Sequence, residues 1–306
     1  MNILFAGSPK SSSRILEFLS KQDSIQIKGV LTQPDKRRKR GSELFESEVS
    51  KVANAFNQKV FKPNNLNGAG LKKEIKELKI DLFIVIAYGK IIPNWLLNLP
   101  KVMSLNVHFS ILPKYRGASP IQSSLLNGDK QTGISFMQMS QGLDEGDLIL
   151  TAPALIDEKD NKTSLESKLT SLTIENILNV ITVLENETAS ITKQDNSHAT
   201  YCKKIHREDS ITDFNDSAIN IINKFKAYFE WPGLSFIFKN VQIKVHEISI
   251  TNKKSVGPAG SVYEINKNGI YVNTIDKMIV ITNLQFPNKK KISALDAFNS
   301  YLSFFK

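Results

Sequence analysis

Two separate stretches of the sequence carry side chains whose types suggest a single site. In NVHFSILP, residues 106–113, polar residues occupy every second position, namely Asn106, His108 and Ser110. Because alternate residues of a strand share a face, Asn106 and His108 would project together from a strand. In MQMSQGLDEGD, residues 137–147, Asp144 follows a leucine and lies between two glycines. We expect its carboxylate to be a buried partner of His108, so that an amide, an imidazole and a carboxylate converge.

Each of these residues also has a purely structural interpretation. Asn106 could cap a turn, His108 could be a satisfied core histidine, and the acidic loop around Asp144 could be a solvated turn. A calcium loop is disfavoured, because neither the spacing of the acids nor the position of the glycines fits one. An amide and an imidazole together at the end of a strand nevertheless favour function over coincidence.

The elements that would position these residues follow an alternating pattern of short apolar runs and helical patterns. Strands are predicted at 3–6, 25–31, 81–87 and 102–108, and helices at 11–22, 44–56, 69–78, 118–127 and 163–184. The run 81–87 is apolar at nearly every position, as in a parallel strand covered on both faces. The alternation predicts an α/β fold with a doubly wound, mostly parallel sheet, in which ligands bind at the carboxyl ends of the strands. Thr163 and Glu166 would form the capping box of the last helix.

The pattern changes in the last third of the chain. A polar, aperiodic stretch typical of a linker is followed by strand-like runs that turn signals separate, at 234–250, 260–264, 269–274 and 278–286. Helices are predicted on either side of these runs, at 217–229 and 293–302. This pattern predicts a small β-barrel of the oligonucleotide-binding (OB) type. The predicted domains are therefore 1–188, a linker at 189–206, and a C-terminal barrel at 207–306.

Composition excludes several classes of protein. The single cysteine, Cys202, cannot form an internal disulfide and argues against a cysteine-built zinc site. The longest apolar run, 82–88, is far shorter than the roughly 20 residues that a membrane span requires. The start of the chain lacks a basic segment followed by a long apolar one, so we expect no signal peptide and a cytoplasmic protein. The net charge of +10, with 15 Lys and Arg against 9 Asp and Glu in residues 201–306, is compatible with a polyanionic partner.

The two polar stretches, read together, resemble a known family. NVHFSILPKYRGASPIQ (106–122) and GISFMQMSQGLDEGD (133–147) are similar to the formyl-tetrahydrofolate-dependent transferases, and most similar to the methionyl-tRNA formyltransferases among them. FAGSP (5–9), TQPD (32–35), VIAYGKIIP (85–93) and WPG (231–233) extend the resemblance, in order, over nearly the whole chain.

The resemblance implies a reaction and a site. The formyl donor would be 10-formyltetrahydrofolate, and the acceptor the α-amine of methionine on initiator tRNA, for translation initiation. Asn106 and His108 would direct donors at the oxyanion of a tetrahedral intermediate, while Asp144 would orient His108 and move protons. The folate would contact residues of two loops, namely Ser110, Ile111, Leu112, Pro113, Tyr88 and Gly89. The resemblance implies neither a metal nor a nucleotide cofactor, and the segment 7–9 lacks a G-x-G-x-x-G pattern.

A run of five cations follows the second predicted strand. It comprises Lys36, Arg37, Arg38, Lys39 and Arg40. A solvated loop is the alternative, but the family places a basic loop here that meets the acceptor stem of tRNA. We expect these side chains to neutralise phosphates of the tRNA. We also expect the chain to act as a monomer.

Two other functions remain open at this point. The first is a small-molecule formyltransferase that acts on glycinamide ribonucleotide or an amino sugar, against which the basic run and the basic last third argue. The second is an RNA-binding module on a degenerate formyltransferase scaffold, against which the presence of Asn106, His108 and Asp144 argues.

Overall fold

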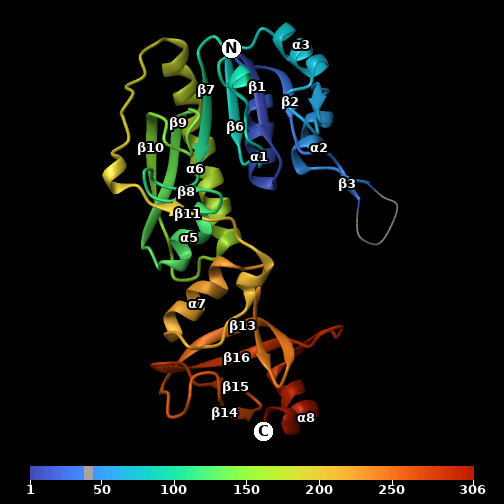
Figure 1. Cartoon of the computed structure of the whole chain (residues 1–306), viewed down its shortest axis with the longest axis vertical. Helices are drawn as coiled ribbons and strands as arrows, with labels where there is room; N and C mark the ends of the chain where they lie inside the picture. The colour runs from blue at the N-terminus through green and yellow to red at the C-terminus, as the bar shows by residue number, and fades with distance from the viewer. Residues whose placement is uncertain (38–43) are drawn as a thin grey trace. The chain divides into compact units, whose positions relative to one another are not determined.

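The computed structural model describes residues 1–37 and 44–306, which form two compact units (Figure 1). Unit 1 comprises Met1–Pro120, Gln131–Leu155 and Glu166–Tyr201. Unit 2 comprises Ile121–Lys130, Ile156–Leu165 and Cys202–Lys306.

Unit 1 is built on a seven-stranded sheet with the strand order β10-β9-β7-β6-β1-β2-β5. Figure 1 labels these strands except β5. Its strands are β1 (Asn2–Gly7), β2 (Gln26–Leu31), β5 (Val60–Phe61), β6 (Leu82–Ile86), β7 (Met103–His108), β9 (Gln131–Gln138) and β10 (Leu148–Leu155). The strands from β7 to β5 pair in parallel, whereas β9 pairs antiparallel with both β7 and β10. The predicted doubly wound, mostly parallel sheet is confirmed.

Helices and apolar residues on both faces of this sheet explain why its central strands are apolar throughout. The helices of unit 1 are α1 (Lys10–Ser20), α2 (Glu48–Ala55), α3 (Ala69–Glu77), α4 (Asn94–Leu97) and most of α6 (Lys162–Glu185), whereas all of α5 (Pro120–Leu126) but its first residue belongs to unit 2. Ile3 and Phe5 on one face of β1, and Leu4 and Ala6 on the other, are all fully buried. When both faces of a strand are buried, every side chain lies in the core, so polar and apolar residues do not alternate along it.

One predicted helix starts later than expected. A helix from Leu44 was wrong, because Leu44 and Phe45 form strand β4 (Leu44–Phe45), which pairs with β3 (Lys36–Arg37). Helix α2 starts at Glu48, because the Ser47 side chain accepts a hydrogen bond from the backbone N of Ser50 at 3.0 Å and so acts as its N-cap.

The predicted capping box of α6 is also wrong. The side-chain oxygen of Asn161 accepts hydrogen bonds from the backbone N of Thr163 and of Ser164, at 2.9 and 3.1 Å, so Asn161 caps this helix. Glu166 instead accepts a hydrogen bond from the Ser11 hydroxyl at 2.8 Å and joins α6 to α1.

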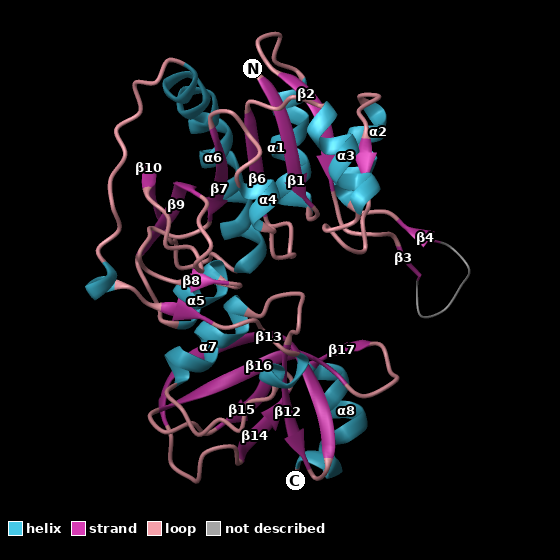
Figure 2. Ribbon diagram, turned by 45° about the horizontal axis from the view of Figure 1, so that its top comes forward, coloured by secondary structure: helices cyan, strands magenta, loops and turns pink. Residues whose placement is uncertain are grey.

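Unit 2 contains an antiparallel sheet with the order β12-β13-β16-β15-β14, and β17 pairs with β16 (Figure 2). Its strands and helices are α7 (Ala218–Ala227), β12 (Leu234–Phe238), β13 (Val241–Lys254), β14 (Val262–Asn266), β15 (Gly269–Val272), β16 (Lys277–Gln285), β17 (Lys291–Ser293) and α8 (Ala294–Phe305). Helices α7 and α8 pack on the sheet around a core that includes Phe236, Ile281 and Phe305. A small antiparallel domain after the α/β sheet confirms the predicted order of folds.

The predicted run 234–250 is two strands rather than one. Lys239 and Asn240 have φ values of 46° and 63° and form the two-residue turn between β12 and β13. Positive φ at both residues suits the right-handed twist of a tight hairpin.

The remaining short elements are β8 (Arg116–Gly117), β11 (Tyr201–Cys202) and two 3₁₀ helices, η1 (Asn196–His198) and η2 (Arg207–Ser210). Within residues 1–37 and 44–306, no helix combines the length and the apolar character that crossing a bilayer requires.

Candidate active site

Asn106, His108 and Asp144 meet at the carboxyl end of β7. The first two lie on β7, and Asp144 lies in the loop between β9 and β10. The Nδ2 of Asn106 donates to Asp144 Oδ1 at 3.5 Å, and the Nδ1 of His108 lies 3.6 Å from Asp144 Oδ2. Because β7 and β9 are antiparallel, Gln138 at the end of β9 pairs with Leu105, and the loop that follows must run back along β7 to bring Asp144 to its carboxyl end. The structure thus brings the three predicted side chains together.

The Asp144 carboxylate is held on three sides. Besides Asn106 and His108, the backbone N of Gly117 donates to Asp144 Oδ2 at 2.8 Å. The side chain of Asp144 is 17% exposed and that of His108 6% exposed. Coulombic interactions are stronger at such a partly enclosed position than in bulk water. The carboxylate is therefore fixed, yet part of its surface remains exposed.

The hydrogen bonds of His108 define its tautomer. Its Nε2 lies 2.8 Å from the backbone oxygen of Tyr115. Because a carbonyl oxygen only accepts, Nε2 must carry the hydrogen. The nitrogen that can gain or lose a proton is then Nδ1, which faces Asp144.

Three residues in this region have a left-handed backbone conformation. Tyr115, Asp144 and Ala87 have φ values of 60°, 52° and 47°, in the left-handed region that residues other than glycine rarely adopt. Such conformations cost on the order of 1–3 kcal/mol each, and they cluster at functional sites. The carbonyl that accepts from His108 and the residue that carries the carboxylate are both held in this way.

One glycine allows the loop after β9 to return against its strand. A Cβ at Gly146 would lie 1.8 Å from the backbone oxygen of Gln138, so only glycine fits here. The close approach places Asp144, two residues earlier, beside β7.

The predicted folate-binding segment after β7 contains both structural and accessible residues. The Ser110 hydroxyl is fully buried and donates to the Lys114 oxygen at 2.6 Å. Leu112 is buried, and its backbone N donates to the Ser135 hydroxyl at 3.0 Å. Ile111 and Pro113 are half-buried and therefore retain surface that a ligand can contact.

In the segment after β6, a ligand could contact backbone atoms but not the buried ring of Tyr88. That ring is 2% exposed within an apolar cluster, and burial raises the pKa of its hydroxyl to about 12. The backbone oxygen of Tyr88 accepts a hydrogen bond from the Gln33 side chain at 2.8 Å. Gly89 is exposed with a φ of 76°. Of the two predicted contact residues, Gly89 is the one with accessible surface.

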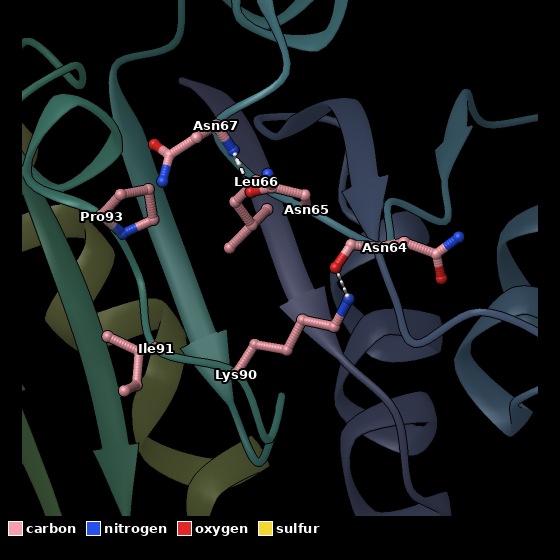
Figure 3. A pocket seen from close by; sticks show the side chains of 7 residues that line it. All are labelled: Asn64, Asn65, Leu66, Asn67, Lys90, Ile91 and Pro93. Atoms are coloured by element: carbon pink, nitrogen blue, oxygen red, sulfur yellow. Dashed lines mark hydrogen bonds between the residues drawn. The ribbon is translucent and has the colours of Figure 1, made fainter.

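A cavity of about 280 Å³ opens beside the same segment, and Figure 3 shows its lining. It is lined by Asn64, Asn65, Leu66, Asn67, Lys90, Ile91 and Pro93. The Lys90 ammonium donates to the backbone oxygens of Pro63 and Asn64, the latter at 3.1 Å. The cavity therefore combines three carboxamides and one anchored cation.

The predicted tRNA-binding run is only partly described. Lys36 and Arg37 form β3, and Arg38, Lys39 and Arg40 lie outside the described residues. In the described part of the chain, no group of three or more His, Cys, Asp and Glu side chains is arranged to hold a metal ion.

Sequence reasoning missed two residues that support the site. Arg116 is 1% exposed and donates to the side-chain oxygen of Gln194 from Nε and Nη2, at 3.1 and 2.8 Å. Gln194 in turn donates to the backbone oxygens of Asp144 and Gly146, at 2.9 and 2.6 Å. Arg116 lies within residues 106–122, which resemble the family, but the sequence does not show that its side chain points toward Gln194. Gln194 lies in a polar stretch with no pattern to mark it.

Comparison with known families gives two matches that cover most of the chain. Residues 1–181 match the formyl transferase family, and residues 204–302 match the formyl transferase C-terminal domain. Among curated relatives, methionyl-tRNA formyltransferase from Francisella philomiragia is 38% identical over 300 residues, which is 98% of this chain and 95% of the relative. The protein of the same name from Legionella pneumophila is 35% identical over the same shares. The chain therefore belongs to the formyl transferase family, as the resemblance predicted.

Solved structures show the same fold at lower identity. An N-formyltransferase from Helicobacter canadensis, in complex with folinic acid and dTDP-3-aminofucose, has a TM-score of 0.68 and 22% identity. The match covers 93% of this chain and 99% of that one. The sugar 3N-formyl transferase WlaRD has a TM-score of 0.67 and 23% identity, with 95% and 99% covered.

Proposed function

We propose that this chain transfers the formyl group of 10-formyltetrahydrofolate to the α-amine of methionyl initiator tRNA. The observation that carries the proposal is the convergence of Asn106, His108 and Asp144, with both heavy-atom distances to the carboxylate at 3.5–3.6 Å. The relatives named methionyl-tRNA formyltransferase, at 35–38% identity over 98% of the chain, support this choice of acceptor.

Asn106 is the donor that best suits the oxyanion. The amine attacks the formyl carbon, and the carbonyl oxygen takes the negative charge of the tetrahedral intermediate. The carboxamide of Asn106 has two N–H bonds, and Asp144 Oδ1 accepts one of them. The other can be donated to the oxyanion, where one such donor contributes about 10²–10³ in rate. A donor role for His108 stays a prediction, because its Nε2 donates to Tyr115 in this structure.

The His108–Asp144 pair would move the proton. The attacking amine must lose a proton, and the folate nitrogen must gain one as its bond to the formyl carbon breaks. An α-amine has a pKa of about 7.7–8.0, so a neutral fraction is available near neutral pH without a strong base. Asp144 would take the proton, share it with Nδ1 of His108, and return it to the leaving nitrogen. The products are the formylated methionyl-tRNA and tetrahydrofolate.

We place the folate donor along the two loops that follow β6 and β7. Gly89, Ile111 and Pro113 have accessible surface there, whereas Ser110, Leu112 and Tyr88 would shape the site from behind. The nearby cavity with Lys90 and three asparagines has groups that suit the carboxylates of a folate tail.

We assign tRNA binding to the basic surfaces of the chain. The net charge is +10, and five consecutive cations occupy residues 36–40. Cations that neutralise phosphates would make tRNA affinity fall steeply with salt. The chain would act as a monomer in the cytoplasm, with folate as co-substrate and without a metal or a nucleotide cofactor.

The test is an assay of the purified chain with 10-formyltetrahydrofolate and either charged initiator tRNA or charged elongator tRNA. We expect formylation of the initiator only. Transfer to amino sugars or to glycinamide ribonucleotide instead of tRNA would overturn the proposed acceptor. Tight tRNA binding without turnover would overturn the proposed activity.

A further inference from the structure

Within the residues that the structure describes, the buried guanidinium of Arg116 has no acidic partner. It donates to Gln194 Oε1 from two nitrogens, to the Asn196 side-chain oxygen at 2.7 Å, and to the Tyr201 hydroxyl at 3.5 Å. Among the described residues, no carboxylate pairs with it. Burying a charge among neutral acceptors is unfavourable compared with an apolar side chain of similar size. A specific function of this arginine would explain why such an arrangement is present.

Arg116 fixes which way the Gln194 carboxamide points. A guanidinium has donors only, so the oxygen of Gln194 must face it. The NH₂ group of Gln194 is therefore directed to the opposite side, where it donates to the backbone oxygens of Asp144 and Gly146. The orientation of an amide, usually ambiguous, is determined here by its neighbours.

These two hydrogen bonds act on a strained residue. Asp144 has a φ of 52°, and its carboxylate must lie between Asn106 and His108. Gln194 holds the backbone of Asp144 from one side, while Gly117 N holds its carboxylate from the other at 2.8 Å. A left-handed residue keeps its conformation only where its surroundings hold it.

We propose that Arg116 and Gln194 are a positioning pair that holds Asp144 in its reactive geometry. In the proposed mechanism neither residue acts on the formyl carbon or the amine, so both would act through Asp144. The effect on rate rests on the proposed function, but the effect on the loop does not. A displacement of about 1 Å at a reacting group can reduce the rate about 10²-fold.

Gln194→Glu separates positioning from general stability. The new carboxylate would gain an ion pair with Arg116, which offsets the repulsion between its second oxygen and the carbonyl oxygens of Asp144 and Gly146, so we expect the thermal midpoint to change little. It has no N–H to donate to Asp144 and Gly146, and we expect kcat to fall about 10–100-fold with both KM values within about threefold. Gln131→Glu makes the same chemical change at an exposed residue at the other end of β9 and should leave kcat unchanged.

A second measurement does not depend on catalysis. Amide hydrogen exchange in the segment 138–147 should be faster in Gln194→Glu than in the wild type and unchanged in Gln131→Glu. Should Gln194→Glu not fold, the shorter amide of Gln194→Asn serves the same comparison, with the same losses expected.

The outcomes can be told apart. A folded Gln194→Glu enzyme with wild-type kcat, or with wild-type exchange in the loop, would overturn the positioning pair. A wild-type chain that formylates no tRNA would overturn the proposed function, and the exchange data alone would then decide on the pair.

Discussion

The carboxyl end of β7 and the core of unit 2 differ in the kinds of side chain that they bury. Around β7, His108, Ser110 and Arg116 are buried polar groups, each with a hydrogen-bond partner. The core of unit 2 is a cluster of aliphatic and aromatic side chains that includes Phe236 and Ile281.

Left-handed residues occur in both regions, and in unit 2 they include the core residue Phe214, with a φ of 63°. Tyr115 and Asp144 adopt this conformation within the polar site, whereas Lys239 and Asn240 adopt it in an exposed hairpin turn. In the turn the conformation satisfies a local geometric need, while in the site it aims groups at one another. The contrast suggests that substitutions in the first region will affect catalysis and those in the second will affect stability.

The largest expected effect is on catalysis. Asp144→Asn keeps an oxygen that can accept from Gly117 but cannot take a proton from the amine. We expect kcat for formyl transfer to fall about 10²–10⁴-fold, with the thermal midpoint and tRNA affinity little changed. Glu145→Gln removes a charge from the adjacent exposed residue and is the control. Full activity in Asp144→Asn would remove this residue from the mechanism.

The second expected effect is on stability, in the other region. Phe236 is 3% exposed in the core of unit 2, and its ring lies 5.2 Å from that of Phe214. Phe236→Ala should lower the free energy of unfolding by about 3–5 kcal/mol, as measured by denaturant titration. Ile237→Ala, at the adjacent exposed residue, should cost much less. Equal losses in the two variants would contradict the assignment of this core.

A smaller effect on stability is expected at Tyr88, whose buried hydroxyl differs from the hydrogen-bonded polar groups around β7. Among the described residues, its hydroxyl has no hydrogen-bond partner. Tyr88→Phe should leave the free energy of unfolding unchanged or raise it, by up to about 1–3 kcal/mol. A clear loss of stability at neutral pH would show that the hydroxyl is satisfied.

Ionisation of Tyr88 should also make the free energy of unfolding depend on pH. The pKa of Tyr88 is about 12 in the native state, whereas an unfolded tyrosine ionises near pH 10. The unfolded state therefore releases this proton first, and the stability that Tyr88 contributes falls as pH rises from about 10 to about 12. Denaturation at alkaline pH should show a steeper decline in the wild type than in Tyr88→Phe, in which Tyr228, whose pKa burial also raises, still contributes. Tyr263→Phe, at an exposed tyrosine, is the control.

The sequence contained enough to predict most of the sheet and the three side chains that the structure brings together at the end of β7. Apolar runs and their order predict β1, β2, β6 and β7, because burial on both faces leaves a strong signal. The alternation of Asn106 and His108 places both on one face of β7. The family resemblance then links them to Asp144, which no local pattern could bring to β7.

The remaining features depend on contacts between distant segments. Nothing in the sequence shows that Tyr115 would accept from His108, or that Gln194 would reach the backbone of Asp144. The hydrophobic pattern of Tyr88 fits both a pocket wall and a core, and packing decided between them. Short-range capping by Ser47 and Asn161 likewise outweighed the patterns that placed α2 and α6 differently.

The most direct test of the central claim is the single-turnover rate of formyl transfer in Asn106→Ala, measured with saturating folate donor and charged initiator tRNA. If the amide stabilises the oxyanion, transfer should be slower by about 10²–10³-fold while both substrates bind as in the wild type. A transfer rate within about threefold of the wild type would show that the formyl oxygen is stabilised elsewhere, and the proposed site would be wrong.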